Sequence, residues 1–288
     1  MAPRPDDLTV LFLESHDGGS HRAFREGLVA HSVHTFRCLT MRPRYWKWRM
    51  RAAAARFADL LRDDPEPRPD VILATSLVNL AELRGLLPPP LDRVPLVLYM
   101  HENQLTYPLS PLEEFDFHFG FTSILSSLAA DLVVFNSAFH RDLFLDAIPA
   151  FLNRMPEDAP RGVPERLAAR SRVLPVGLDR SPLPEGMVPA WRGGPCDAEA
   201  GPPWPRGSRP VILWNHRWEF DKRPEWFAAA VGRLLDRGLD FEVILAGDSR
   251  HRDAVFAPLI DRLQGRCLHH GHADRDRYLD LLQRSDVV

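Results

Sequence analysis

The sequence predicts an α/β protein of two doubly wound, Rossmann-like domains, and three observations carry this prediction. Short apolar runs rich in Val, Leu and Ile recur along the chain, and most are separated by amphipathic helical patterns. Such alternation is typical of parallel sheets covered on both faces. A long stretch rich in proline and glycine interrupts the pattern late in the chain. A length of 288 residues also suits two modest domains.

Six apolar runs are predicted to be strands, with helices between most of them. In chain order they are Thr9–Leu13, Val71–Ala74, Pro95–Met100, Leu132–Phe135, Val211–Trp214 and Phe241–Ala246. Between Pro149 and Pro210 the pattern breaks, and only Arg172–Leu178 resembles a strand there. Residues 284–288 look like the end of a helix and the opening of another strand. We therefore expect the second domain to be incomplete.

These patterns predict three regions. We expect an N-terminal, acceptor-side domain at residues 1–180, with a proline-rich tail from about residue 149. A linker rich in proline and glycine follows at residues 181–208, and a partial nucleotide-sugar-binding domain occupies residues 209–288.

Composition excludes several classes of protein. A formal net charge of -3 and a pI near 6.5 argue against a globally basic protein that coats nucleic acid. The cysteines Cys38, Cys196 and Cys267 are too few and too widely spaced for a disulfide framework or a paired-cysteine metal site. Neither a signal peptide nor a run of membrane-spanning length is visible. A cytoplasmic protein with no membrane partner is expected.

A glycine pair follows the first predicted strand and precedes a helical pattern. Gly18 and Gly19 allow a tight turn close to a ligand, while Ser20 can cap the helix so that its amide groups face an anion. We expect a substrate loop that includes His21. A plain turn between strand and helix is the alternative.

Polar residues follow two further predicted strands of the first domain. His101 can exchange a proton near neutral pH or hold a sugar hydroxyl, and it begins a polar cluster at the edge where open sheets bind ligands. Helix capping and bonding to the core are the alternative. The predicted substrate-binding residues here are Glu102, Asn103, Gln104, Asn136 and Ser137.

The second domain carries a basic loop after its first strand. Arg217 can donate two hydrogen bonds to phosphate oxygens, and Lys222 adds a second charge, which together suit a diphosphate leaving group. Gly247 follows the next strand. His270 and Gly271 lie in a histidine-rich run that we predict to be a loop contacting a nucleobase. No metal site is expected, because no cysteine or carboxylate has ligand spacing.

Basic and aromatic residues alternate near the start of the chain. Aromatic rings stack on bases while Arg and Lys hold phosphates, so this segment is predicted to contact RNA. Inward packing of one or both tryptophans is the alternative. The predicted RNA-binding residues are Arg44, Trp46, Lys47, Trp48 and Arg49.

Five phrases together give the sequence a family resemblance. They are His16-Asp-Gly-Gly-Ser-His21, Tyr45-Trp-Lys-Trp-Arg49, His101-Glu-Asn-Gln104 with Tyr107-Pro108, Val133-Val-Phe-Asn-Ser137 and His216-Arg-Trp-Glu219 with Asp221-Lys222. With these phrases the chain resembles the tRNA-queuosine α-mannosyltransferase family. The resemblance implies a GT-B fold and retaining transfer of mannose from GDP-mannose to queuosine in the anticodon of a tRNA.

The resemblance also implies roles for individual residues. Arg217 and Lys222 would offset the diphosphate charge in place of a metal ion, and His101 would hold the transferred sugar or the acceptor. No cofactor beyond the nucleotide-sugar donor is implied. The family continues beyond residue 288 into a segment with a glutamate-containing donor motif.

Two other functions remain open from the sequence. One is a retaining GT-B glycosyltransferase that acts on a lipid, a glycan or a small molecule, in which the basic and aromatic segment is structural. The other is a non-catalytic protein that binds RNA or nucleotides.

Overall fold

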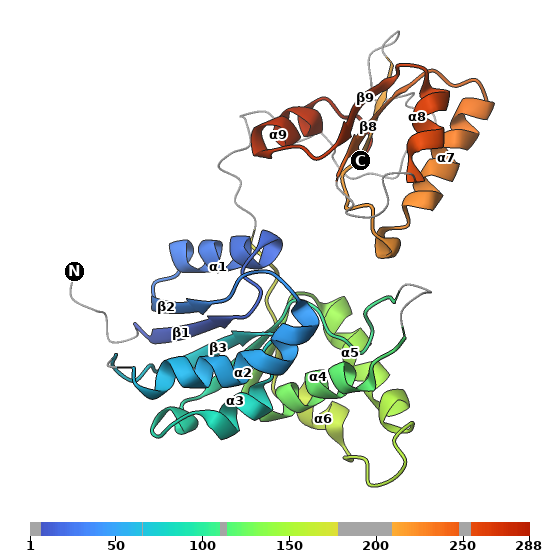
Figure 1. Cartoon of the computed structure of the whole chain (residues 1–288). Helices are drawn as coiled ribbons and strands as arrows, with labels where there is room; N and C mark the ends of the chain where they lie inside the picture. Colours follow the sequence, from blue (N-terminus) through green and yellow to red (C-terminus); the bar gives the residue numbers. More distant parts are fainter. Residues whose placement is uncertain (1–6, 65, 110–113, 178–208, 248–254) are drawn as a thin grey trace. The chain divides into compact units, whose positions relative to one another are not determined.

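Two compact units divide the chain, one containing strands β1 to β6 and the other containing β7 to β9 (Figure 1). The computed structural model describes residues 7–64, 66–109, 114–177, 209–247 and 255–288. The predicted linker at 181–208, with Cys196, lies outside these residues. Among the helices described, none is both long and apolar enough to cross a membrane.

The first unit is built on a six-stranded parallel sheet with the order β2-β1-β3-β4-β5-β6. From β1 the chain first adds β2 on one side and then returns to place β3 on the other. Ligands of open α/β sheets bind where the strand order reverses in this way. The strands are β1 (Thr9–Glu14), β2 (Thr35–Thr40), β3 (Val71–Thr75), β4 (Leu96–Met100), β5 (Leu132–Phe135) and β6 (Ser171–Val173).

Alternate residues of these strands point to opposite faces of the sheet. On one face, Phe12 and Tyr99 pack against Phe24 of helix α1. On the other face, Leu11 and Leu13 belong to a larger core that the remaining helices cover (Figure 1). The helices are α1 (Gly19–His31), α2 (Trp46–Arg62), α3 (Leu80–Leu86), η1 (Leu91–Arg93), α4 (Phe117–Ala129), α5 (Ala138–Leu152) and α6 (Val163–Ala168).

The second unit has a three-stranded parallel sheet with the order β7-β8-β9. Its larger core surrounds Trp218, and a smaller core on the other face includes Leu281. Val287 forms a parallel bridge with Ile212 of β7, as the predicted opening of a strand requires. The elements are β7 (Val211–Trp214), η2 (Phe220–Lys222), α7 (Pro224–Asp236), β8 (Glu242–Ala246), α8 (Ala257–Leu263), β9 (Cys267–Gly271) and α9 (Arg275–Gln283).

The six predicted strands are confirmed, with ends that move by at most a residue. The proline-rich tail predicted from about residue 149 contains regular structure. Pro149 lies inside α5, and α6 and β6 complete the first unit, because their apolar residues Val163 and Leu167 are buried in its core. The strand predicted at Arg172–Leu178 is shorter and begins earlier, at Ser171.

Candidate functional site

Three strands of the first sheet deliver the predicted site residues to its carboxyl edge. The loop after β1 leads to His21, the loop after β4 begins with His101, and the turn after β5 contains Asn136. Because β1 and β4 both border β3, and β5 borders β4, these loops lie close together.

His21 joins two of these loops through a pair of carboxylates. Its Nδ1 atom lies 3.0 Å from Oε2 of Glu14 at the end of β1, and its Nε2 atom lies 3.5 Å from Oε2 of Glu102 after β4. Burial alone would lower the pKa of His21, but the hydrogen bonds and charges of Glu102 and Glu14 outweigh it and raise the pKa to about 10. This raised pKa favours a protonated His21 between the two carboxyl groups. Glu14 was not among the predicted site residues.

His101 packs against this cation and is itself neutral. Its ring centroid lies 4.2 Å from that of His21, and the rings of Phe24 and Tyr99 each lie 4.8 Å away. Burial and the neighbouring charge of His21 lower the pKa of His101 to about 4. Within the described residues, its buried Nε2 atom has no hydrogen-bond partner. A buried polar atom without a partner is costly, which makes it suited to bond a ligand.

A third histidine, His140 of α5, ties the other two loops together. Its Nδ1–H donates to Oδ1 of Asn136 at 3.0 Å, and its Nε2 accepts a bond from Nδ2 of Asn103 at 2.9 Å. Asn136 also donates to the carbonyl oxygen of His101 at 2.8 Å, and Ser137 caps α5 by accepting from the amide of His140. The capping alternative is thus observed for Ser137.

Gln104 is the least engaged of the predicted residues here. Its amide lies 3.4 Å from Oγ of Ser123, and its side chain is half-buried. A substrate role for Glu102, Asn103, Gln104, Asn136 and Ser137 stays a prediction.

The glycine pair lies at the start of α1 as expected, but the helix is not capped as expected. Gly18 is the N-cap residue of α1, and no side chain caps this helix, so the predicted cap by Ser20 is wrong. Ser20 lies inside the first turn, whereas a capping residue must precede it. Gly19 has a φ of 52°, a left-handed conformation that favours glycine.

The predicted RNA-contacting segment lies directly beside this glycine loop. The amide of Met41 donates to the carbonyl of Glu14, and the carbonyl of Met41 accepts from the amide of Asp17, both at 2.9 Å. A β-carbon on Gly18 would stand 2.5 Å from Cγ of Pro43. The start of the segment and the glycine loop are therefore in direct contact.

The two tryptophans of this segment differ in their surroundings. Trp46 is half-buried, and its ring centroid lies 5.4 Å from that of Phe119. Trp48 is 63% exposed, and Tyr45 at the start of α2 is 78% exposed. Arg49 is half-buried and donates to the carbonyl of Arg42 at 3.3 Å. Inward packing thus applies to Trp46 and not to Trp48.

In the second unit, the predicted residues gather at the carboxyl edge of the sheet. A β-carbon on Gly247 would stand 2.2 Å from the carbonyl oxygen of His216 and 2.8 Å from Nε1 of Trp218. The amide of Gly247 also donates to the carbonyl of Gly271 at 2.9 Å. Only a glycine allows the ends of β8 and β9 to approach the loop after β7 this closely.

The basic residues of that loop are exposed. Lys222 lies 3.0 Å from the carboxylate of Asp221. Arg217 is exposed and has no ion pair within the described residues. The buried Nε1 atom of Trp218 has no partner in the same part of the chain. A phosphate-binding role for Arg217 and Lys222 stays a prediction.

The histidine-rich run was predicted to be a loop, and this prediction was wrong. Most of the run belongs to strand β9. Ile244 pairs with His269, Leu245 with His270 and Ala246 with Gly271. Parallel pairing with a buried neighbour overrides the low strand propensity of the run. His270 still lies at the edge, with its ring centroid 4.9 Å from that of Trp218.

One group of side chains has the spacing of metal ligands. Atoms of Glu14, His21 and His101 lie within 4.8 Å of one another. His21 also faces Glu102, so within the described residues this histidine has two carboxyl partners.

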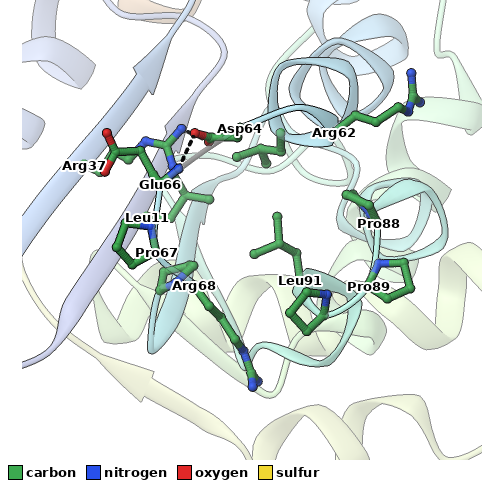
Figure 2. Close-up of a pocket in the computed structure, with 13 residues that line it drawn as sticks. Leu11, Arg37, Arg62, Asp64, Glu66, Pro67, Arg68, Pro88, Pro89 and Leu91 are labelled. Atoms are coloured by element: carbon green, nitrogen blue, oxygen red, sulfur yellow. Dashed lines mark hydrogen bonds and ion pairs between the residues drawn. The ribbon is translucent and has the colours of Figure 1, made fainter.

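A pocket of about 190 Å³ in the first unit lies away from all these residues (Figure 2). Its lining includes Pro67 and Pro69, which precede β3, and Pro88, Pro89 and Pro90, which precede β4. It therefore lies toward the amino ends of these strands. An ion pair between Arg37 and Asp64 closes one side of it (Figure 2).

Comparison with known proteins decides the family. The family model described as tRNA-queuosine alpha-mannosyltransferase N-terminal matches residues 9–178. The tRNA-queuosine alpha-mannosyltransferase of Drosophila melanogaster is 33% identical over 283 residues, which cover 97% of this chain and 72% of that protein. The chain belongs to the tRNA-queuosine alpha-mannosyltransferase family. A member of this family is a glycosyltransferase, as the sequence predicted.

Solved structures share the fold of this family member. Sucrose-phosphate synthase from Thermosynechococcus elongatus matches with a TM-score of 0.56 at 16% identity, covering 95% of this chain and 72% of that chain. The N-terminal domain of trehalose-6-phosphate phosphatase from Candida albicans also matches with a TM-score of 0.56, at 12% identity, covering 98% and 78%. The predicted α/β fold of the GT-B type is confirmed.

Proposed function

We propose that this glycosyltransferase moves mannose from GDP-mannose to queuosine in the anticodon of a tRNA, with retention at the anomeric carbon and without a metal ion. The bond between the anomeric carbon and the diphosphate breaks, and a bond to a hydroxyl oxygen of the cyclopentene-diol forms. GDP leaves, and the hydroxyl proton is released. A tRNA acceptor agrees with the expected cytoplasmic location.

The observation that carries this proposal is the basic and aromatic surface beside the glycine loop. Residues 41–58 contain six basic residues and no acidic one, in a chain whose formal net charge is -3. The segment is hydrogen-bonded to the loop through the backbone of Met41. A polyanion drawn to this surface would place an unpaired nucleotide next to the site.

Exposed rings make the same surface suited to RNA rather than to any other anion. Tyr45 and Trp48 present large aromatic faces to solvent among Arg44 and Lys47. Base stacking on such a face is worth about 1–3 kcal/mol per base and tolerates any base. The unpaired bases of an anticodon loop offer suitable partners.

The second unit supports a nucleotide-sugar donor. Arg217 forks two hydrogen bonds and Lys222 adds a point charge, which stabilise the diphosphate as its negative charge grows. Gly247 brings the edges of β7, β8 and β9 together. A nucleobase that stacks on the exposed ring of His270, which itself packs on buried Trp218, would complete donor binding without a cation.

The first unit supplies groups for sugar or diol hydroxyls. Within the part of the chain that the structure describes, the buried Nε2 atom of neutral His101 has no partner, and it can bond a hydroxyl group. The carboxylate of Glu102 stays ionised, since its hydrogen bond to His21 and the charge of His21 outweigh burial and lower its pKa. An ionised carboxylate and a neutral imidazole side by side are suited to recognise hydroxyl groups.

Mass analysis of nucleosides tests the function directly. We expect that tRNA carrying queuosine, incubated with the protein and GDP-mannose, yields a nucleoside heavier by one mannose together with an equal amount of GDP. The same tRNA with guanosine at the wobble position is the matched control and should gain nothing.

Two results would redirect the proposal. Transfer to a lipid, a glycan or a small molecule, with no transfer to tRNA, would favour the alternative acceptor class. Salt-dependent tRNA binding without any GDP release from queuosine-containing tRNA would favour a protein that only binds RNA.

A further inference from the structure

At the carboxyl edge of the first sheet, the side chains of Glu14, His21 and Glu102 lie in a row, which we call the Glu–His–Glu chain. Glu14 ends β1, His21 lies in the first turn of α1, and Glu102 follows β4. The side chain of Glu14 is fully buried and that of His21 is 10% exposed. Since each nitrogen atom of His21 faces one carboxylate, the imidazolium fixes the distance between the two loops.

The two ends of this chain differ in access to a substrate. The side chain of Glu102 is 27% exposed, whereas that of Glu14 is not exposed at all. Oε2 of Glu102 lies 3.5 Å from Nε2 of His21, and no hydrogen bond of Oε1 is found within the described residues. Glu102 is therefore the end of the chain that a bound molecule can touch.

The residues around the Glu–His–Glu chain favour a positive charge on His21 rather than on its neighbouring histidines. His16 and His101 flank His21, and burial together with the charge of His21 lowers the pKa of each. On α2, Arg49 adds a positive charge near His16, and on α5, His140 faces Glu102 with a pKa lowered by burial. With both flanking histidines neutral, His21 is the cation that neutralises Glu102.

We propose that Glu14 and His21 are positioning residues that hold the Glu102 carboxylate so that its free oxygen accepts a hydrogen bond from a hydroxyl group of the acceptor nucleoside. The acceptor is the occupant because the basic and aromatic segment borders the same loop through Met41 and Glu14. This inference rests on the proposed function, which supplies the hydroxyl group.

Separate Michaelis constants for tRNA and GDP-mannose test the contact. Glu102→Gln keeps the shape and removes the charge, and we expect it to raise the KM for tRNA by about 10- to 100-fold, as for loss of a hydrogen bond to a charged group. The KM for GDP-mannose should not change. Glu157→Gln, at an exposed glutamate in a loop of the same unit, is the matched control and should leave both constants unchanged.

Glu14→Gln tests positioning, because Glu14 is too buried to touch a substrate. Without the Glu14 carboxylate, His21 should lose its proton nearer neutral pH, so the KM for tRNA should rise with pH between about 7 and 9. The wild-type KM should stay flat there. A residue that only supports the fold would alter protein yield and stability without giving this pH dependence.

The outcomes separate this inference from the proposed function. No mannose transfer by the wild-type protein would count against the function itself. Normal wild-type transfer with an unchanged KM for tRNA in Glu102→Gln would overturn the inference, even if Glu14→Gln failed to fold. A rise in the KM for GDP-mannose alone would place Glu102 on the donor and would also overturn it.

Discussion

Pro43 lies so close to Gly18 that a β-carbon on Gly18 would stand 2.5 Å from Cγ and 2.7 Å from Cβ of the proline ring. A proline ring cannot rotate away, so a side chain here must move one of the two loops. Through this contact, the glycine loop sets the position of the basic and aromatic segment.

Gly18→Ala should therefore displace the segment from the glycine loop. We expect the catalytic efficiency with tRNA to fall by at least about tenfold, because misplacement of about 1 Å can cost as much as a hundredfold. Gly27→Ala is the matched control: it lies in α1 with nothing within 4 Å of an added β-carbon, and alanine favours the helix by about 0.5–1 kcal/mol. Equal activity of the two variants would contradict the coupling.

Trp46 and Trp48 should respond differently to alanine. Trp46→Ala removes a half-buried ring that packs against Phe119, so the free energy of unfolding should fall by about 2–4 kcal/mol, somewhat below the cost for a fully buried ring. Trp48→Ala should change it by no more than about 0.5 kcal/mol. Urea unfolding measures both.

For tRNA affinity we expect the opposite order, with the larger loss in Trp48→Ala. Trp48→Ala is expected to weaken binding by about 1–3 kcal/mol through the loss of a stacked base. Arg44→Ala with Lys47→Ala should also flatten the dependence of affinity on salt concentration, because fewer phosphates are neutralised. Full tRNA affinity and an unchanged salt slope in these variants would indicate that the segment is structural.

The sequence predicted strands best where a strand is buried on both faces of the sheet. The run Val71–Ala74 is enclosed on both faces of the sheet, so its apolar character alone predicted β3. Strand β2 was missed because it lies at the sheet edge, and its residues Thr35–Thr40 are half-buried or exposed and include Arg37. An edge strand has less need for apolar side chains.

The site was predictable loop by loop but not as a network. Glu14 was visible as the end of a strand, yet its importance comes from His21 and Glu102, which only the fold brings to it. His140 looked like an ordinary helical residue, because its partner Asn103 is 37 residues away along the chain. Contacts between separate strands have no local sequence signal.

The stability of the protein should depend on pH through His21. Its pKa is raised from 6.5 to about 10 in the folded protein, so the bound proton stabilises the fold fully below about pH 6.5, and this contribution is lost as the pH rises toward 10. His21→Gln should cost about 3–5 kcal/mol near pH 6.5, as when one partner of a buried ion pair is removed, and less at pH 10.

Urea unfolding of both proteins at several pH values measures this difference. His31→Gln, at an exposed histidine at the other end of α1, is the control and should follow the wild type at every pH. A gap between wild type and His21→Gln that stays constant from pH 7 to 9.5 would show that His21 does not hold the proton.

Arg217 should act on the donor and not on the acceptor. Arg217→Ala is expected to lower the catalytic efficiency with GDP-mannose by about 10²- to 10³-fold, the usual cost of losing one donor that stabilises growing negative charge. The affinity for tRNA should not change. Arg217→Lys should recover only part of the loss, because lysine keeps the charge but not the paired hydrogen bonds.

Chelation completes this test. If Arg217 and Lys222 stabilise the diphosphate in place of a cation, wild-type activity should survive an excess of EDTA, and added Mg²⁺ should not rescue Arg217→Ala. Arg237→Ala, at an exposed arginine at the end of α7, is the matched control and should keep wild-type kinetics. Loss of wild-type activity in EDTA, restored by a divalent cation, would contradict the metal-independent mechanism, because the two basic side chains would then not suffice to stabilise the leaving GDP.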